Sequence, residues 1–107
     1  MPLLEKKCIQ CEGSTSPLKQ EEVQKLLKEI PSWEIKDGHV FRQFKFKNFK
    51  EAIAFVNKVG EIAENEGHHP DITINYNKVS IELFTHSIKG LSENDFIVAA
   101  KISKLAK

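Results

Sequence analysis

Three of the four histidines, His68, His69 and His86, flank one predicted β-hairpin. Apolar and polar residues alternate on both sides of a turn expected at Asn77-Lys78, which is typical of two strands. The two ends of an antiparallel hairpin lie together, so we expect His86 close to His68 or His69. Imidazole titrates near neutrality, and two imidazoles facing one site can divide the roles of proton donor and acceptor. Such a pair suits the addition or elimination of water.

Two other interpretations of these histidines compete with acid–base catalysis. Adjacent histidines before a proline also occur as plain loop residues. Zinc takes three or four ligands, but neighbouring residues of an extended segment point in opposite directions, which makes joint ligation by His68 and His69 awkward. We therefore expect no metal. The fourth histidine, His39, follows the turn dipeptide Asp37-Gly38 and is expected to be a solvated loop residue.

Cys8 and Cys11 have the C-x-x-C spacing, but no second pair follows and no strand-to-helix junction is expected there. Zinc shared with a partner chain and reversible oxidation are the functional alternatives, and an arm without a function is the favoured interpretation. The sequence contains no glycine-rich phosphate-binding motif and no hydrolase nucleophile motif.

Composition sets the broad class of protein. A chain of 107 residues with 40% hydrophobic and 29% charged residues suits one soluble folded domain. Sixteen Lys and Arg against fifteen Asp and Glu give a net charge of +1, which does not favour nucleic acid as a partner. No apolar run approaches the roughly 20 residues of a membrane helix. The N-terminus lacks the apolar stretch of a secretory signal, so we expect no membrane contact and a cytoplasmic location.

The residues divide into an N-terminal arm over 1–17 and a domain over 18–107. Helical spacing predicts helices over 18–30, from Asn48 to Gly67, and from Ser92 to the C-terminus. Strands are expected on both sides of Asp37-Gly38 and on both sides of Asn77-Lys78. The order α-β-β-α-β-β-α predicts an α+β fold, with a four-stranded antiparallel sheet and the helices packed on one face. Its open face and edges favour a homo-oligomer.

A set of residues spread along the sequence resembles the residue pattern of the pterin-4a-carbinolamine dehydratase family. The pattern is an acid, then His-His-Pro, an aromatic residue, a later histidine and a later aspartate, and a tryptophan follows the first helix. The matching residues are Trp33, Glu64, His68, His69, Pro70, Tyr76, His86 and Asp95. The resemblance covers the chain from about Leu18 to the C-terminus.

The resemblance implies that the protein is a hydro-lyase. The family dehydrates 4a-hydroxytetrahydropterin to quinonoid dihydropterin and so recycles the pterin cofactor of aromatic amino-acid hydroxylases. Pterin is then the substrate, and neither a metal nor a separate cofactor is implied. The C4a hydroxyl must leave with a proton while N5 loses one, so we assign acid and base work to His68 and His86. His69 is assigned to binding or to proton transfer near the hydroxyl.

The other matching residues are expected to bind the substrate or to act as orienting residues; they are Glu64, Pro70, Tyr76, Asp95 and Trp33. Glu64 and Asp95 could each hold a histidine in one tautomer, and Asp95 could equally cap its helix. Animal members of the family also bind a transcription factor as a dimerisation coactivator, which is the alternative function. A second alternative is an accessory protein that binds pterin for another pathway. The expected assembly is a homodimer or homotetramer.

Overall fold

The computed structural model describes residues 2–8 and 16–105. Its elements follow the order α-β-β-α-β-β-α, with two short 3₁₀ helices added. They are η1 (Leu3–Glu5), α1 (Gln20–Leu27), β1 (Glu34–Lys36), β2 (His39–Lys45), α2 (Phe49–Glu66), β3 (Asp71–Asn75), β4 (Lys78–Leu83), η2 (His86–Ile88) and α3 (Glu93–Leu105). The predicted α+β fold is confirmed.

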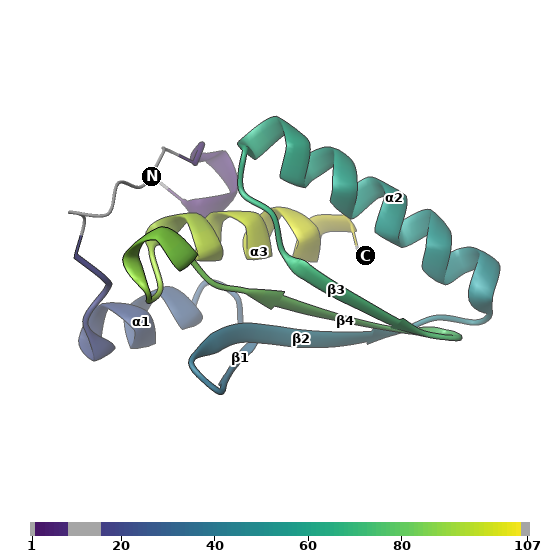
Figure 1. Ribbon diagram of the computed structural model, residues 1–107, viewed down its shortest axis with the longest axis horizontal. Coiled ribbons are helices and arrows are strands. Elements are labelled where there is room, and N and C mark those ends of the chain that lie inside the picture. The colour runs from purple at the N-terminus through teal and green to yellow at the C-terminus, as the bar shows by residue number, and fades with distance from the viewer. Residues whose placement is uncertain (1, 9–15, 106–107) are drawn as a thin grey trace.

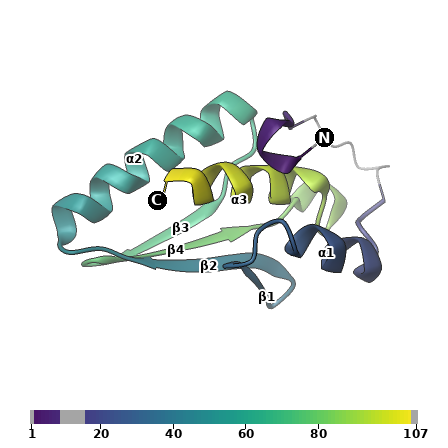
Figure 2. The same ribbon diagram turned by 180° about the vertical axis from the view of Figure 1, so that it is seen from behind.

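The four strands form one antiparallel sheet in the order β1-β2-β4-β3. Val40 of β2 faces Leu83 of β4, and Asp71 of β3 faces Glu82 of β4. Figure 1 and the reverse view in Figure 2 show α2 and α3 side by side on one face of this sheet. No described helix covers the opposite face.

The core lies between the sheet and the helices because the strands alternate. Val79, Ile81 and Leu83 of β4 are fully buried, and the residues between them are only partly buried. The helix α3 supplies the matching apolar surface through Phe96, Val98 and other buried residues. Burial of apolar surface at this interface is the main stabilising contribution.

Both ends of α2 are set by the residues predicted for them. The Asn48 side chain accepts a hydrogen bond from Glu51 N at 2.9 Å, which satisfies one of the free donors at the N-terminus of the helix. Gly67 ends α2 in the left-handed region, with φ of 66°. This cap fixes the direction in which the chain leaves toward His68.

The structure corrects some details of the predicted elements. The second hairpin turns at Tyr76 and Asn77 rather than at Asn77-Lys78, and Tyr76 has a positive φ of 54°. The first helix ends at Leu27, and the residues up to Ile30 continue as 3₁₀-type turns. The helices of the described ranges are all too short or too polar to cross a membrane.

Residues 2–8 of the predicted arm pack on the domain. Leu3 is 2% exposed and belongs to the core cluster. Further along, Leu18 N donates to Leu91 O at 2.8 Å. Cys11 lies outside the described residues.

Candidate active site

The first pair of the site joins the end of α2 to the start of α3. His68 follows the left-handed cap at Gly67, and Asp95 lies in the first turn of α3. The distance between His68 Nε2 and Asp95 Oδ1 is 2.6 Å. The side chain of His68 is 12% exposed and that of Asp95 is fully buried. Two residues far apart in the sequence thus form a buried imidazole–carboxylate pair.

The second oxygen of Asp95 is held by donors from the loop between β4 and α3. Asp95 Oδ2 accepts from Thr85 Oγ1 at 2.8 Å and from Ser92 N at 3.0 Å. Because the Thr85 hydroxyl donates its only proton to Asp95, it must accept from Ser92 Oγ, which lies 2.8 Å from Thr85 Oγ1. All of these contacts treat Asp95 as an acceptor, which is the behaviour of an ionised carboxylate.

This hydrogen bonding selects the tautomer of His68. Asp95 Oδ1 accepts, so His68 donates its Nε2 proton when the imidazole is neutral. The other ring nitrogen, Nδ1, then carries a lone pair. This arrangement leaves Nδ1 of His68 able to accept a hydrogen bond or a proton.

A second imidazole–carboxylate pair lies on the surface. His69 Nε2 is 2.5 Å from Oε2 of Glu64, which lies in α2. These side chains are 60% and 78% exposed. Consecutive residues of an extended segment point in opposite directions, which explains why His68 is buried and His69 is not. Glu64 therefore orients His69 toward solvent, next to the buried pair.

The third histidine lies beside an aromatic side chain at the end of β4. His86 is exposed, and its ring meets that of Phe84 at 5.1 Å in an edge arrangement. Extending the register between β3 and β4 places Thr85 opposite His68. The Thr85–Asp95–His68 hydrogen bonds agree with that placement. The ends of the hairpin meet as predicted, and His86 follows directly after Thr85.

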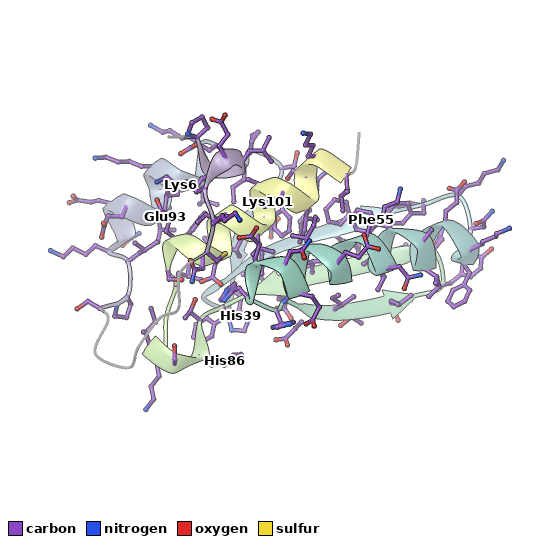
Figure 3. The ribbon with its side chains drawn as sticks, turned by 90° about the horizontal axis from the view of Figure 1, so that it is seen from above. Lys6, His39, Phe55, His86, Glu93 and Lys101 are labelled. Atoms are coloured by element: carbon purple, nitrogen blue, oxygen red, sulfur yellow. The ribbon has the colours of Figure 1, made fainter. Side chains whose placement is uncertain are left out.

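The prediction that His39 is a solvated loop residue is wrong. His39 is the first residue of β2, and its ring lies 4.5 Å from that of Phe84. Its Nδ1 atom is buried, without a hydrogen-bond partner, at 3.7 Å from Glu82 Oε1. The tight turn at Asp37-Gly38 returns the chain to the sheet so quickly that the next residue already pairs with β1. Figure 3 shows His39 and His86 in the same corner of the molecule.

Two of the predicted site residues are not brought to the histidines. Trp33 is a core residue whose Nε1 donates to Ser103 Oγ at 2.7 Å and whose ring packs against Phe44. Tyr76 lies at the tip of the second hairpin, 65% exposed, at the end of β3 opposite to His69. Pro70 is half-buried between His69 and β3. In this chain, Trp33 supports the core and Tyr76 lies on the surface.

Sequence reasoning missed several residues that shape the site. Phe84 and His39 were not assigned to it, although the predicted strands place them on neighbouring strands at one end of the sheet. The contact of Thr85 with Asp95 became visible only with the loop that follows β4. Within residues 2–8 and 16–105, the structure forms no group of three His, Cys, Asp or Glu side chains able to hold a metal ion.

The fold and this site together define a class of protein: a small α+β domain with two neighbouring histidines that are each paired with a carboxylate. The chain matches the family model described as pterin 4 alpha carbinolamine dehydratase over residues 16–105. It belongs to this family, so the resemblance seen in the sequence is confirmed.

Relatives of similar length support the assignment. The chain is 49% identical over 104 residues to a protein of Rubrobacter xylanophilus, covering 96% of this chain and 97% of the relative. A protein of Alkaliphilus metalliredigens is 51% identical, covering 95% and 94%. Both carry the name putative pterin-4-alpha-carbinolamine dehydratase.

A solved structure supports the same fold. It is a crystal structure described as a transcriptional coactivator/pterin dehydratase from Brucella melitensis. It superposes with a TM-score of 0.81 at 33% identity, covering 86% of this chain and all of that one.

Proposed function

We propose that this protein catalyses the dehydration of 4a-hydroxytetrahydropterin to quinonoid dihydropterin and water. The observation that carries the proposal is the buried His68–Asp95 pair, which arranges His68 Nδ1 as a proton acceptor. Two further histidines, His69 and His86, lie at the same end of the β3–β4 hairpin. Membership of the dehydratase family supports this substrate class.

In the proposed reaction, one histidine acts as the base and another as the acid. His68 removes the N5 proton through Nδ1, and the N5–C4a double bond forms as the C4a–O bond breaks. His86 donates a proton to the departing hydroxyl, which leaves as water. His69, held by Glu64, binds near that hydroxyl. The base gains one proton and the acid loses one, so exchange with solvent restores both groups.

The aromatic rings beside the histidines suit a flat substrate. Phe84 lies between His39 and His86, with ring-centre distances of 4.5 and 5.1 Å. Aromatic rings stack favourably on planar heterocycles, and a pterin is such a ring system. We propose that the pterin is bound as substrate only, with no metal, in a cytoplasmic homo-oligomer that recycles the pterin cofactor.

The decisive experiment measures the rate of dehydration of freshly generated 4a-hydroxytetrahydropterin at fixed pH. We compare the wild type with His68→Ala and with Glu61→Gln, an exposed change in α2. The proposal expects acceleration by the wild type and the control, with a loss of about 10²-fold or more in His68→Ala. A folded wild type that gives no acceleration contradicts the proposal.

A second candidate function is the binding of a protein partner. It is favoured by the description of the Brucella melitensis structure, which names a coactivator role beside the dehydratase. The two functions separate experimentally, because partner binding does not need a proton acceptor at His68. A His68→Ala variant that keeps a partner's affinity but loses dehydration would show both roles in one chain.

A further inference from the structure

The N-terminal strap, which we define as residues 2–8, is fastened to the domain at several points. Leu3 is buried, and its backbone N–H donates to Glu29 Oε1 at 3.2 Å. Lys6 Nζ donates to Glu93 Oε2 at 2.5 Å, and Figure 3 shows these two side chains together. Cys8 N donates to Glu66 Oε1 at 2.8 Å. The strap therefore contacts the last turn of α2 and the first turn of α3.

These two turns carry the buried histidine–carboxylate pair. Glu66 is the last residue of α2, and only Gly67 separates it from His68. Asn94 directly precedes Asp95 in α3, and the Cys8 thiol lies 3.7 Å from the Asn94 carbonyl oxygen, to which it donates. The strap thus connects the chain immediately before His68 with the chain immediately before Asp95.

Glu66 is the residue on which these contacts converge. Its side chain is 9% exposed, and its Oε2 atom accepts from Lys101 Nζ of α3 at 2.5 Å. Burial alone would raise the pKa of Glu66, but the hydrogen bonds from Lys101 and from Cys8 N outweigh burial and lower it. The carboxylate is therefore charged at neutral pH and holds α2, α3 and the strap together.

We propose that Glu66 is a positioning residue for the His68–Asp95 pair, acting through the ends of α2 and α3 and held in place by the strap. This inference rests on the proposed function, because it assumes that His68 moves the proton. A 2.6 Å hydrogen bond between two helix ends requires those ends to keep a fixed separation. Glu66 is hydrogen-bonded to both α3 and the strap, and it lies two residues before His68.

The first test compares Glu66→Gln with Glu61→Gln. Both changes remove one negative charge from α2 at nearly constant shape, but Glu61 is exposed. For Glu66→Gln we expect kcat to fall about tenfold with KM within about twofold, since misplacement of a reacting group affects mainly the chemical step. The NMR signals of the His68 ring nitrogens and of the Nε2 proton should shift as the bond to Asp95 lengthens. Glu61→Gln should keep the wild-type values.

A second pair of variants tests the strap without changing Glu66. Cys8→Pro removes the backbone N–H that donates to Glu66, whereas Cys8→Ala keeps it and removes only the thiol. We expect the proline variant to reproduce the kcat loss and the His68 shift, and the alanine variant to lose less. This pair decides the question even if Glu66→Gln does not fold.

The outcomes also separate this inference from the proposed function. If both Glu66→Gln and Cys8→Pro keep the wild-type kcat and the wild-type His68 signals, the positioning role of Glu66 is overturned. An inactive His68→Ala variant would still support the proposed function in that case. An active His68→Ala would overturn the proposed function, and the NMR signals of His68 would still show whether Glu66 positions the pair.

Discussion

His68 Nε2 and Asp95 Oδ1 are 2.6 Å apart. The imidazole of His68 is nearly buried, and the carboxylate of Asp95 is fully buried. The neighbouring residue, His69, makes a similar bond to Glu64 at 2.5 Å, but on the surface. One chemical pairing thus occurs in two environments, side by side. Solvent screens the outer pair and not the inner one, so changes to the two pairs should have different consequences.

Asp95→Asn should remove the proton acceptor from His68. An asparagine that keeps its oxygen toward Thr85 and Ser92 presents an amide N–H₂ to His68 Nε2. The imidazole must then accept at Nε2 and carry its proton on Nδ1, the wrong tautomer for a base. We expect kcat to fall by about 10²-fold or more, and ¹⁵N NMR should show the exchanged tautomer. Unchanged kcat in Asp95→Asn would show that this tautomer is not used.

Glu64→Gln should have little effect on stability. Exposed ion pairs contribute roughly 0–1 kcal/mol, so we expect the free energy of unfolding to change by less than about 1 kcal/mol. Substrate binding should be affected instead, because the amide orients His69 less firmly than the carboxylate. In His69→Ala we expect KM to rise by up to about tenfold, because one hydrogen bond from His69 to the substrate is lost. In Glu64→Gln we expect a smaller rise in KM. Urea unfolding and steady-state kinetics measure the two effects separately, and a large loss of stability in Glu64→Gln would show that the outer pair is not screened.

Gly67→Ala and Gly60→Ala should change stability in opposite directions. Gly67 has φ of +66°, a conformation that costs an L-residue roughly 1–2 kcal/mol. Gly60 lies inside α2, and an added Cβ would meet nothing within 4 Å beyond the neighbouring backbone of the helix, so alanine there should stabilise the helix by about 0.5–1 kcal/mol. Urea unfolding of both variants checks the signs. Gly67→Ala should also lower kcat, because His68 follows the cap, and equal effects of the two changes would contradict this account of the α2 terminus.

The sequence predicts the fold well because its signals are local. Alternating strands, the turn at Asp37-Gly38 and the caps at Asn48 and Gly67 each act within a few residues, and the structure contains all of them. Tyr76 shows the limit of such signals. It continues the alternation of β3 in the sequence, yet it occupies the turn with a positive φ, because the hairpin closes one residue earlier than expected.

The site was only partly predictable, because its contacts are long-range. That the two ends of the hairpin meet followed from hairpin geometry, but the partner of His68 is 27 residues away on another helix. His39 was misjudged because its environment depends on Phe84, a residue of a neighbouring strand. Nothing in the local pattern around Cys8 indicated that its backbone would hold Glu66. Such contacts arise from packing and not from the propensity of any segment.

The Cys8 thiol should be unreactive in the folded protein. Burial, followed by the nearby charge of Glu66, raises the pKa of Cys8 from its ordinary 9.0 to about 12, so little thiolate forms at neutral pH. In a Cys11→Ser background, which leaves Cys8 as the single thiol, alkylation by iodoacetamide at pH 8 should be slow until urea unfolds the chain. Rapid alkylation of the folded protein would contradict the burial of this thiol.

The same shift predicts how stability depends on pH. The folded-state pKa of Cys8 lies above the unfolded value, so its contribution is complete below pH 9.0 and is lost as the pH rises toward about 12. In Cys8→Ala this part of the alkaline decline should disappear. Glu66→Gln should lower the folded-state pKa of Cys8 by removing a neighbouring negative charge, so the decline should still begin near pH 9.0 but end at a lower pH and be smaller, and alkylation should be faster. Urea unfolding at a series of alkaline pH values measures both effects, and equal slopes in the wild type and Cys8→Ala would show that Cys8 does not titrate on unfolding.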